Sequence, residues 1–350
     1  MAGKQSNKSI YQILRIVFII GFLVFTALFI NEVVITPYRI QKSLEKTSSY
    51  YKPQEPSKPE GTPSLPDSSL SSVEEDADAL PQTEEAPALP QRDEKGRLIQ
   101  FRELLAVNED VKGWITIPDT NIDYVVMQSG KEKPEYYLYR DLERKDLKAG
   151  SLFLDTKGSL EEHSKNLTIH GHNMKSTDNM FHYLVNFKEM DYYKKRPVFT
   201  FDSIYDTGKW KIFSIFITNG SSAKEELFDY TKADFEDDSD FLNFIYQMRI
   251  RSIYNIDSVD INETDQLLTL STCSYEIKNY RTVVVARKVR EGEEASVDME
   301  KVGLNPKPLY PYSYYHRYGG QAPKLAATFE EAYSKGEINW YNPDPLQTKE

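Results

Sequence analysis

The chain has 350 residues, a formal net charge of −11 and a single cysteine. One cysteine excludes an intramolecular disulfide framework, and no basic stripe suggests a nucleic-acid partner. Much of the negative charge lies in residues 52–95, which hold eleven acidic and four basic side chains, a net of −7. The acidity therefore describes one segment and says little about the partner of the folded part.

The N-terminal region contains one strongly apolar segment, residues 10–35, which we predict to be a transmembrane signal anchor. About 20 apolar residues suffice to cross a bilayer as a helix. Lys4, Lys8 and Arg15 precede or begin the segment, which places residues 1–9 in the cytoplasm and the rest of the chain outside the cell. A cleaved signal peptide is the alternative, but the segment is long for one and no small-x-small cleavage site follows it. We expect a single-pass protein held in the lipid bilayer by this anchor.

Residues 36–96 are predicted to form an extracellular, disordered linker rich in Pro, Ser and Glu. Within it, residues 52–95 hold eight of the 18 prolines and no aromatic residue. Such a composition cannot bury enough apolar surface to offset the entropy lost on ordering. We therefore expect a flexible connection that keeps the folded domain near the membrane surface.

The folded domain is predicted to span residues 97–292, which is long enough for one substantial domain. Short amphipathic helices are predicted at Phe101–Val107 and Phe241–Ile250, and Asp238 to Asp240 can cap the second one. Elsewhere β signals dominate. Eight strands are predicted: Gly113–Ile117, Ile122–Met127, Ser151–Asp155, Asn166–His170, Val198–Phe201, Lys209–Thr218, Asp265–Thr272 and Thr282–Val289. Many strands with few helices predict a mostly β fold that forms a barrel.

Reactive side chains gather at the ends of three predicted strands. Cys273 closes one strand, Arg281 opens the next after a seven-residue connection (274–280), and His170 and His172 end an earlier strand. If the last two strands pair as a hairpin, the cysteine and the arginine lie across its mouth. An imidazole can help to ionise a thiol, and a guanidinium can hold a developing oxyanion. A Cys–His–Arg set is therefore sufficient for acyl transfer through a thioester.

Each of these residues also has a structural interpretation. A lone cysteine can be a small buried apolar residue, and Arg281 can be a charge at a sheet edge. His170 and His172 could supply half of a zinc site, but no cysteine or carboxylate cluster completes it. Acyl transfer by a Cys–His–Arg set needs neither a metal nor an organic cofactor. The other histidines are predicted to be structural or solvated: His163, His182 and His316.

The three motifs resemble those of sortases, the cell-wall transpeptidases of Gram-positive bacteria. Thr269–Cys273 resembles the TLxTC signature of the family. His170–Met174 resembles its histidine motif, in which the histidine after the glycine, here His172, is catalytic. Arg281, before a Val-rich strand, matches the family arginine. The resemblance spans residues 97–290 and implies a sortase-like closed β-barrel of about eight strands with a few helices.

Within the family the chain is most similar to class B. The features are a helix before the first strand, the segments Asn121–Tyr124 and Lys148–Asp155, and a helix-bearing insert at 221–262. Two positions differ from the pattern. Val125 stands where proline is expected, and Ser274 follows the cysteine where an acidic residue often contributes to substrate binding.

The resemblance implies a mechanism and its partners. Cys273 attacks the threonine carbonyl of a C-terminal sorting signal, expected to be NPxTx-like, on a surface protein. Arg281 and backbone N–H groups hold the oxyanion, and His172 protonates the leaving amine and then activates the incoming one. That amine belongs to a peptidoglycan precursor or to a pilin lysine. Three further residues are candidate substrate contacts, with packing or turn roles as the alternative: Asn121, Tyr230 and Ser271.

Two other functions stay open at this point. A different envelope Cys–His enzyme, such as an L,D-transpeptidase or a cysteine peptidase, would act on peptidoglycan peptides without a threonine signal. An anchored binding module would not need Cys273 at all. A sortase acts on a threonine sorting signal, whereas another envelope Cys–His enzyme does not. Replacement of Cys273 abolishes the function of an enzyme of either kind but not that of a binding module.

Residues 293–350 form an aromatic-rich C-terminal extension that includes Tyr310–Tyr318, Trp340 and Tyr341. Disordered tails are usually poor in aromatic residues. We therefore expect the extension to pack back on the domain or to engage a partner, with a short helix at Glu330–Lys335.

Overall fold

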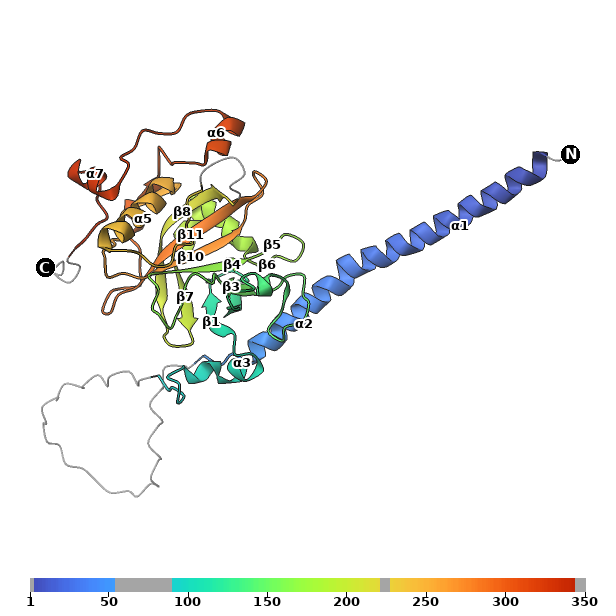
Figure 1. The fold of residues 1–350 in the computed structure, drawn as a ribbon, viewed down its shortest axis with the longest axis horizontal. Coiled ribbons are helices and arrows are strands. Elements are labelled where there is room, and N and C mark those ends of the chain that lie inside the picture. The colour runs from blue at the N-terminus through green and yellow to red at the C-terminus, as the bar shows by residue number, and fades with distance from the viewer. Residues whose placement is uncertain (1–2, 54–89, 221–226, 344–350) are drawn as a thin grey trace, which may run out of the picture.

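A closed barrel of eight β-strands occupies the centre of the molecule (Figure 1). The structure is a computed structural model that describes residues 3–53, 90–220 and 227–343. The barrel has the order β1-β2-β3-β4-β10-β11-β8-β7. Its strands are β1 (Val111–Thr116), β2 (Asp123–Met127), β3 (Leu152–Leu154), β4 (Asn166–Gly171), β7 (Val198–Ser203), β8 (Lys209–Asn219), β10 (Leu267–Cys273) and β11 (Tyr280–Lys288). The predicted barrel is confirmed, and each predicted strand corresponds to one of these eight.

Adjacent strands of the barrel are parallel in two cases, β2 beside β3 and β4 beside β10. All other adjacent strands of the barrel are antiparallel. Thr272 of β10 lies opposite Gly171 of β4. Because parallel strands end at the same edge, the C-terminal ends of β4 and β10 adjoin. β10 turns back into β11 as an antiparallel hairpin, so β11 begins at this edge too.

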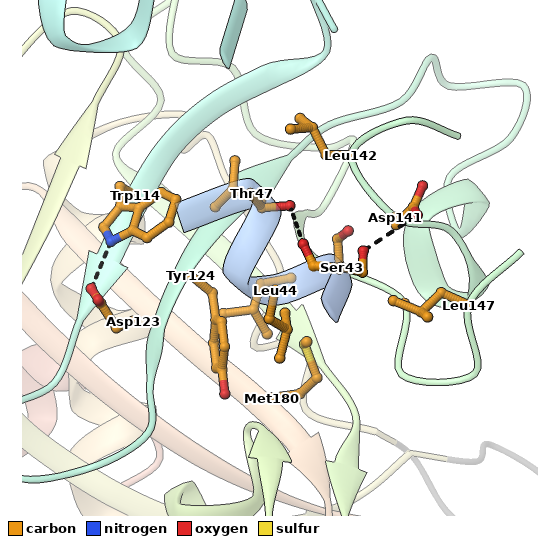
Figure 2. A pocket seen from close by; sticks show the side chains of 14 residues that line it. Ser43, Leu44, Thr47, Trp114, Asp123, Tyr124, Asp141, Leu142, Leu147 and Met180 are labelled. Atoms are coloured by element: carbon orange, nitrogen blue, oxygen red, sulfur yellow. Dashed lines mark hydrogen bonds between the residues drawn. The ribbon is translucent and has the colours of Figure 1, made fainter. Parts of the chain in front are cut away.

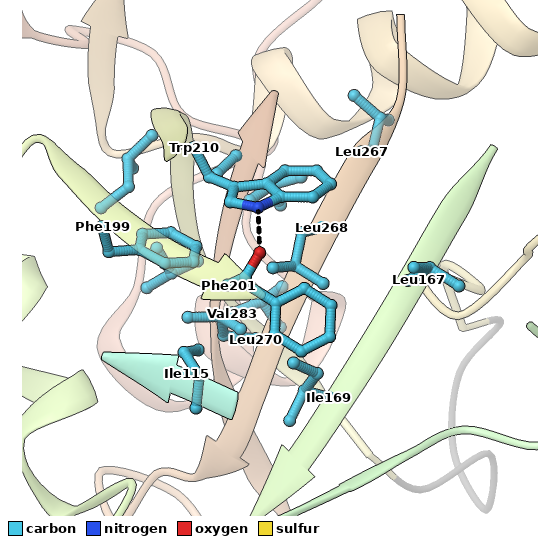
Figure 3. Close-up of a cluster of buried hydrophobic side chains, with 14 of the residues drawn as sticks. Ile115, Leu167, Ile169, Phe199, Phe201, Trp210, Leu267, Leu268, Leu270 and Val283 are labelled. Carbon is cyan, nitrogen blue, oxygen red and sulfur yellow. Dashed lines mark hydrogen bonds between the residues drawn. The ribbon is translucent and has the colours of Figure 1, made fainter. Parts of the chain in front are cut away.

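Apolar side chains from several strands form one buried cluster inside the barrel (Figure 3). Ile115 of β1, Ile169 of β4 and Leu268 of β10 are completely buried. The Trp210 indole N–H donates to the Phe201 carbonyl at 3.3 Å, so its polar atom also has a partner. Burying one such aliphatic side chain stabilises the fold by roughly 1.5–3 kcal/mol. This cluster fixes the strand ends that carry the reactive residues.

Helix α5 (Asp238–Arg251) packs on β8. The Asp237 side chain caps it by accepting from the Asp240 N–H at 2.9 Å, so the helix begins before the predicted Phe241. The other described elements outside the N-terminal helix are short. They are η2 (Ile99–Phe101), α3 (Arg102–Val107), η3 (Tyr136–Tyr139), β5 (Asn173–Met174), β6 (Asn179–Met180), η4 (His182–Lys188), α4 (Met190–Lys195), β9 (Tyr254–Ile256), η5 (Met299–Lys301), β12 (Val302–Leu304), α6 (Tyr312–Tyr318) and α7 (Phe329–Ser334).

The N-terminal region is one continuous helix made of α1 (Gly3–Ile30), the π-helical η1 (Asn31–Ile35) and α2 (Thr36–Ser49). α1 projects away from the barrel, whereas α2 reaches it (Figure 1). By length and composition, the helix over Ile10–Ser49 is able to cross a membrane, and its most apolar window is not buried in the protein. A signal sequence near the N-terminus meets the same criterion. The helix is therefore compatible with the predicted anchor.

The chain was predicted to be a disordered linker from residue 36 onward. This prediction is wrong for residues 36–49, which form the helix α2. Pro37 lies inside the continuous helix, directly after the π-helical η1 and Thr36, and departures from regular α-helical bonding are common at prolines. Ile40, Leu44 and Thr47 recur at helical spacing, and all three turn toward the barrel, with Ile40 fully buried. α2 is therefore a docked amphipathic helix. The predicted linker residues 54–89 lie outside the described part of the chain.

The described part of the C-terminal extension packs on the domain. β12 pairs with β9, and α7 lies against α5 (Figure 1). The Tyr246 hydroxyl of α5 donates to the Ala326 carbonyl at 2.9 Å. A short helix thus forms where one was predicted, and the extension covers α5.

A buried ion-pair cluster joins the start of this extension to the barrel. Arg287 of β11 is completely buried and makes two bonds to the Glu293 carboxylate, each 2.6 Å long. Lys211 of β8 adds a third bond at 2.6 Å. Burial raises the pKa of Glu293, but these partners more than offset burial and hold the pKa at about 2.

We expect Glu293 to stabilise the fold above pH 4.5, its ordinary pKa, and to lose this effect as the pH falls toward 2. The unfolded chain takes up the proton first, and the difference corresponds to about 3 kcal/mol at neutral pH. Glu293→Gln should lower the free energy of unfolding by this order at pH 7 and should flatten its acid dependence. Chemical unfolding of the chain in detergent measures both effects.

Glu294→Gln is the matched control, because it removes the same charge from an exposed neighbour. Equal losses of stability in the two variants would contradict the role given to Glu293.

Candidate active site

Cys273 and Arg281 lie directly opposite each other at the mouth of the β10–β11 hairpin. Cys273 is the last residue of β10 and is half-buried. The pairing is the one expected from the seven-residue connection. His172 follows β4 directly, and its neighbour Gly171 pairs with Thr272. The fold therefore brings the three candidate catalytic residues to one edge of the barrel.

All three residues line one open cleft of about 1020 Å³. The connection between β2 and β3 supplies one wall, which includes Leu138 and Tyr139. This volume is at the upper end of the range for ligand pockets. The cleft is therefore large enough for a short extended peptide.

The imidazole of His172 is shielded from solvent and held by the wall of the cleft. It hydrogen-bonds the Leu138 carbonyl, and the Tyr139 ring centre lies 5.1 Å from its own. Its Nε2 atom is buried and has no partner among the described residues. Burial lowers the pKa of His172 below 6.5, and the Leu138 carbonyl opposes this in part.

Among the described residues, the Arg281 guanidinium makes only long contacts, and these are to its own hairpin. Its Nη1 donates to the carbonyls of Asn279 and Tyr280 at 3.4 and 3.3 Å. Gly220, just after β8, leaves room for it, because a Cβ there would lie 3.2 Å from Arg281 Cζ. Its remaining N–H donors can hold a developing oxyanion or orient a substrate carbonyl.

Asn173 links the histidine strand to the cysteine strand, and the sequence analysis did not single it out. Its side-chain amide donates to the Cys273 carbonyl at 3.0 Å, and its own carbonyl accepts from the Tyr275 hydroxyl at 3.0 Å. Its side-chain oxygen lies 2.9 Å from Nδ1 of His182, which acts as the donor. Because Asn173 directly follows His172, these bonds fix the two strand ends relative to each other. Its place inside the histidine motif was the only signal for this role.

The candidate substrate contacts divide into two groups. Tyr230 and Ser271 line the cleft, and their hydroxyls are 3.0 Å apart. Burial raises the pKa of Tyr230, so its hydroxyl stays protonated. Asn121 is exposed in the β1–β2 turn and does not line the cleft. Ser271 is on β10, and β3 and β4 stand between β10 and β2 in the barrel order.

His170 also lines the cleft, where its Nε2 lies 3.0 Å from a carboxylate oxygen of Asp155. Burial raises the pKa of Asp155, but the bonds from His170 and from the Lys157 N–H outweigh burial and leave it lowered. Within the described ranges, no group of three His, Cys, Asp or Glu side chains could hold a metal ion. His170 is a hydrogen-bond partner of Asp155 in the wall of the cleft.

Ser274, which stands where an acidic residue was expected, is buried behind the cysteine. It donates to the Glu276 carboxylate and accepts from the Thr282 hydroxyl at 3.1 Å. Glu276 also pairs with Lys188, whose pKa is lowered by burial. The loop thus carries a carboxylate two residues later than expected, but a lysine already occupies it.

Comparisons with known proteins agree with this geometry. The family description "Sortase domain" matches residues 115–289, half of the 350-residue chain. The chain belongs to the sortase family. It is a sortase-type cysteine transpeptidase, as its motifs predicted.

Its relatives support the assignment to class B. Sortase B of Staphylococcus aureus is 32% identical over 193 residues, which are 55% of this chain and 75% of that protein. Sortase B of Listeria monocytogenes is 33% identical over 181 residues, 52% of this chain and 69% of that protein.

Solved structures agree as well. A mutant form of Clostridium perfringens sortase B is similar with a TM-score of 0.50 and 27% identity, covering 55% of this chain and 87% of that chain. A Bacillus anthracis protein described as similar to sortase B shares the fold with a TM-score of 0.54 at 24% identity, covering 72% of this chain and 96% of that chain.

The glycine between the two histidines is required by close packing. A Cβ at Gly171 would lie 2.3 Å from Leu152 Cδ2 and 2.9 Å from Phe181 Cδ2. Gly171→Ala in this sortase should therefore destabilise the fold by roughly 1–3 kcal/mol and displace the neighbouring His172. Thermal unfolding and peptide cleavage measure the two effects.

Gly303→Ala provides the control, because a Cβ there meets nothing within 4 Å. The account fails if both alanine variants melt at the temperature of the unmodified protein.

Proposed function

We propose that this sortase cleaves an NPxTx-like C-terminal sorting signal after its threonine and transfers the acylated surface protein to a cell-wall amine. The observation that carries the proposal is the meeting of Cys273, His172 and Arg281 in one cleft. Cys273 is the only cysteine in the sequence. It is therefore the only side chain that can form the thioester that a cysteine transpeptidase requires.

The proposed mechanism gives each group a proton or a charge to handle. The Cys273 thiolate attacks the threonine carbonyl, and Arg281 with backbone N–H groups stabilises the tetrahedral oxyanion. Protonated His172 gives its proton to the leaving amine as the thioester forms. The neutral imidazole then takes a proton from the incoming amine, which attacks the thioester and releases the thiolate.

The substrate peptide is proposed to lie along the cleft between its two walls. Tyr230 and Ser271 offer hydroxyl groups on one side, and Tyr139 offers an aromatic ring on the other. Aromatic rings and hydroxyls suit a short peptide that presents both apolar and amide groups. Asn121 is left out of this proposal because it lies away from the cleft.

The location and the acceptor are also proposed. The apolar helix supports a single-pass anchor at residues 10–35, with the basic residues Lys4 and Lys8 on the cytoplasmic side. The catalytic domain is then extracellular, where surface proteins and the cell wall meet it. The acceptor amine is proposed to belong to a peptidoglycan precursor, with a pilin lysine as the alternative.

The direct test is cleavage of fluorogenic peptides that carry NPxTx or LPxTx signals by the chain in detergent. We expect cleavage after threonine, with the NPxTx peptide preferred. Cys273→Ala should lower kcat/KM by at least about 10³-fold, because it removes the nucleophile.

The outcome against this proposal is a folded sample whose thiol alkylates readily but which cleaves neither peptide. Cleavage of peptidoglycan stem peptides by the same sample would then favour an L,D-transpeptidase or a cysteine peptidase.

The lowered pKa of His172 predicts the pH dependence of cleavage. In the active enzyme, Cys273 and His172 together carry one proton. Activity therefore rises with pH as the form in which both groups are protonated loses its first proton. Burial holds the pKa of the imidazole down, and the acid limb of the bell-shaped kcat/KM profile should therefore lie below pH 6.5. His172→Ala should remove most of the activity. An unchanged profile in this variant would exclude the acid–base role.

A further inference from the structure

Helix α2 packs closely against the barrel and the loop beside it (Figure 2). Leu44 and Thr47 face a surface that includes Trp114, Leu142 and Leu147. The cavity left in this contact measures only about 20 Å³, which is about the room of one water molecule. The contact is therefore a fitted interface.

Polar bonds add to the apolar contact, and they reach the same loop. Ser43 donates to the Asp141 carboxylate at 3.3 Å, and Lys46 pairs with Glu143 at 2.6 Å. Both acidic residues belong to residues 136–151, which we call the support segment. This segment is held by α2 on one side and lines the catalytic cleft on the other.

The support segment also holds the catalytic histidine. The Leu147 N–H donates to the Tyr139 carbonyl at 3.0 Å, so the part under α2 is bonded to the part at the cleft. From there, the Leu138 carbonyl accepts the imidazole bond, and the Tyr139 ring lies against the imidazole of His172. Ser43 and Lys46 of α2 thus bond to the support segment, and the Tyr139 ring of the same segment lies against His172.

His172 depends on these contacts because β4 ends at Gly171 and the barrel ladder no longer restrains it. The support segment contains only the short η3 as regular structure. Asn108 holds it from the other side, by donating to the Tyr137 hydroxyl and to the Leu142 carbonyl at 2.8 Å each. Loss of α2 should therefore loosen the segment without unfolding the barrel.

We propose that α2, the continuation of the N-terminal helix, is a positioning element of the active site. By packing on Leu142 and Leu147 it fixes the support segment, and the support segment fixes the orientation and burial of His172. The inference rests on the catalytic role proposed for His172. In this proposal α2, which continues directly from the predicted anchor, belongs to the structure that positions the catalytic residues.

The test compares two asparagine substitutions on α2 in the full chain in detergent. Leu44→Asn places a polar group in the interface, whereas Gln41→Asn changes an exposed residue on the same helix. We expect Leu44→Asn to lower kcat/KM for a soluble sorting peptide about 10-fold, mainly through kcat. Gln41→Asn should leave it unchanged.

A second readout separates positioning from general loss of fold. Burial is the larger influence on His172 and lowers its pKa. A loosened support segment hydrates the imidazole, so the acid limb of the Leu44→Asn profile should move upward toward pH 6.5. If Leu44→Asn does not fold, Leu44→Ala gives the same comparison with a smaller change.

The proposal is overturned if a folded Leu44 variant keeps both the kcat/KM and the acid limb of the unmodified protein. A failure of the catalytic role proposed for His172 gives a different result. His172→Ala would then be as active as the unmodified protein, independent of the activity of the Leu44 variants.

Discussion

The parallel pairing of β4 with β10 is the constraint on which the rest of the site depends. It places Gly171 opposite Thr272, so the residues that follow, His172 and Cys273, leave the barrel at the same edge. The hairpin to β11 then adds Arg281 opposite the cysteine. No residue of the site needs a long flexible loop to reach its partners. The buried core that aligns these strands is therefore also what aligns the chemistry.

The barrel places the strand ends, and a second layer of contacts fixes the side chains there. Asn173 ties the backbone after His172 to the Cys273 carbonyl, and the Leu138 carbonyl with the Tyr139 ring holds the imidazole. Keeping His172 buried lowers its pKa and leaves Nε2 unpaired. In the proposed mechanism, such an imidazole is neutral when it must accept a proton, and its low solvent exposure reduces competing reactions with water.

The fold and the three motifs could be predicted from sequence because their signals are local. Strand-length apolar runs marked all eight barrel strands, and a short connection marked the Cys273–Arg281 hairpin. The pairing of β4 with β10 joins strands about 100 residues apart, and no local pattern in the sequence predicts it. Asn121 was a candidate from the resemblance alone, and its position outside the lining of the cleft depends on the order of strands in the barrel.

α2 escaped prediction for a different physical reason. The face of α2 that packs on the domain consists mainly of Ile40, Leu44 and Thr47, in a helix that is otherwise polar. This pattern can be recognised as a packing face only when the surface that it contacts is known. Asn173 was missed likewise, because a lone asparagine in a motif says nothing of the carbonyl it will bind. Contacts between distant parts of the chain, rather than local propensity, decide both cases.

The central claim is that the thiol at the end of β10 carries the acyl group of the sorting signal. The most direct measurement is intact-mass analysis of the chain during turnover of an NPxTx peptide without an amine acceptor, followed by mapping of the modified residue. The account predicts an acyl adduct on Cys273 that hydroxylamine or an added amine removes. A stable analogue of the thioester, attached to the enzyme and carried through the same mass analysis, shows that an adduct would be detected. Turnover of the peptide with no adduct on Cys273 under these conditions would contradict the account.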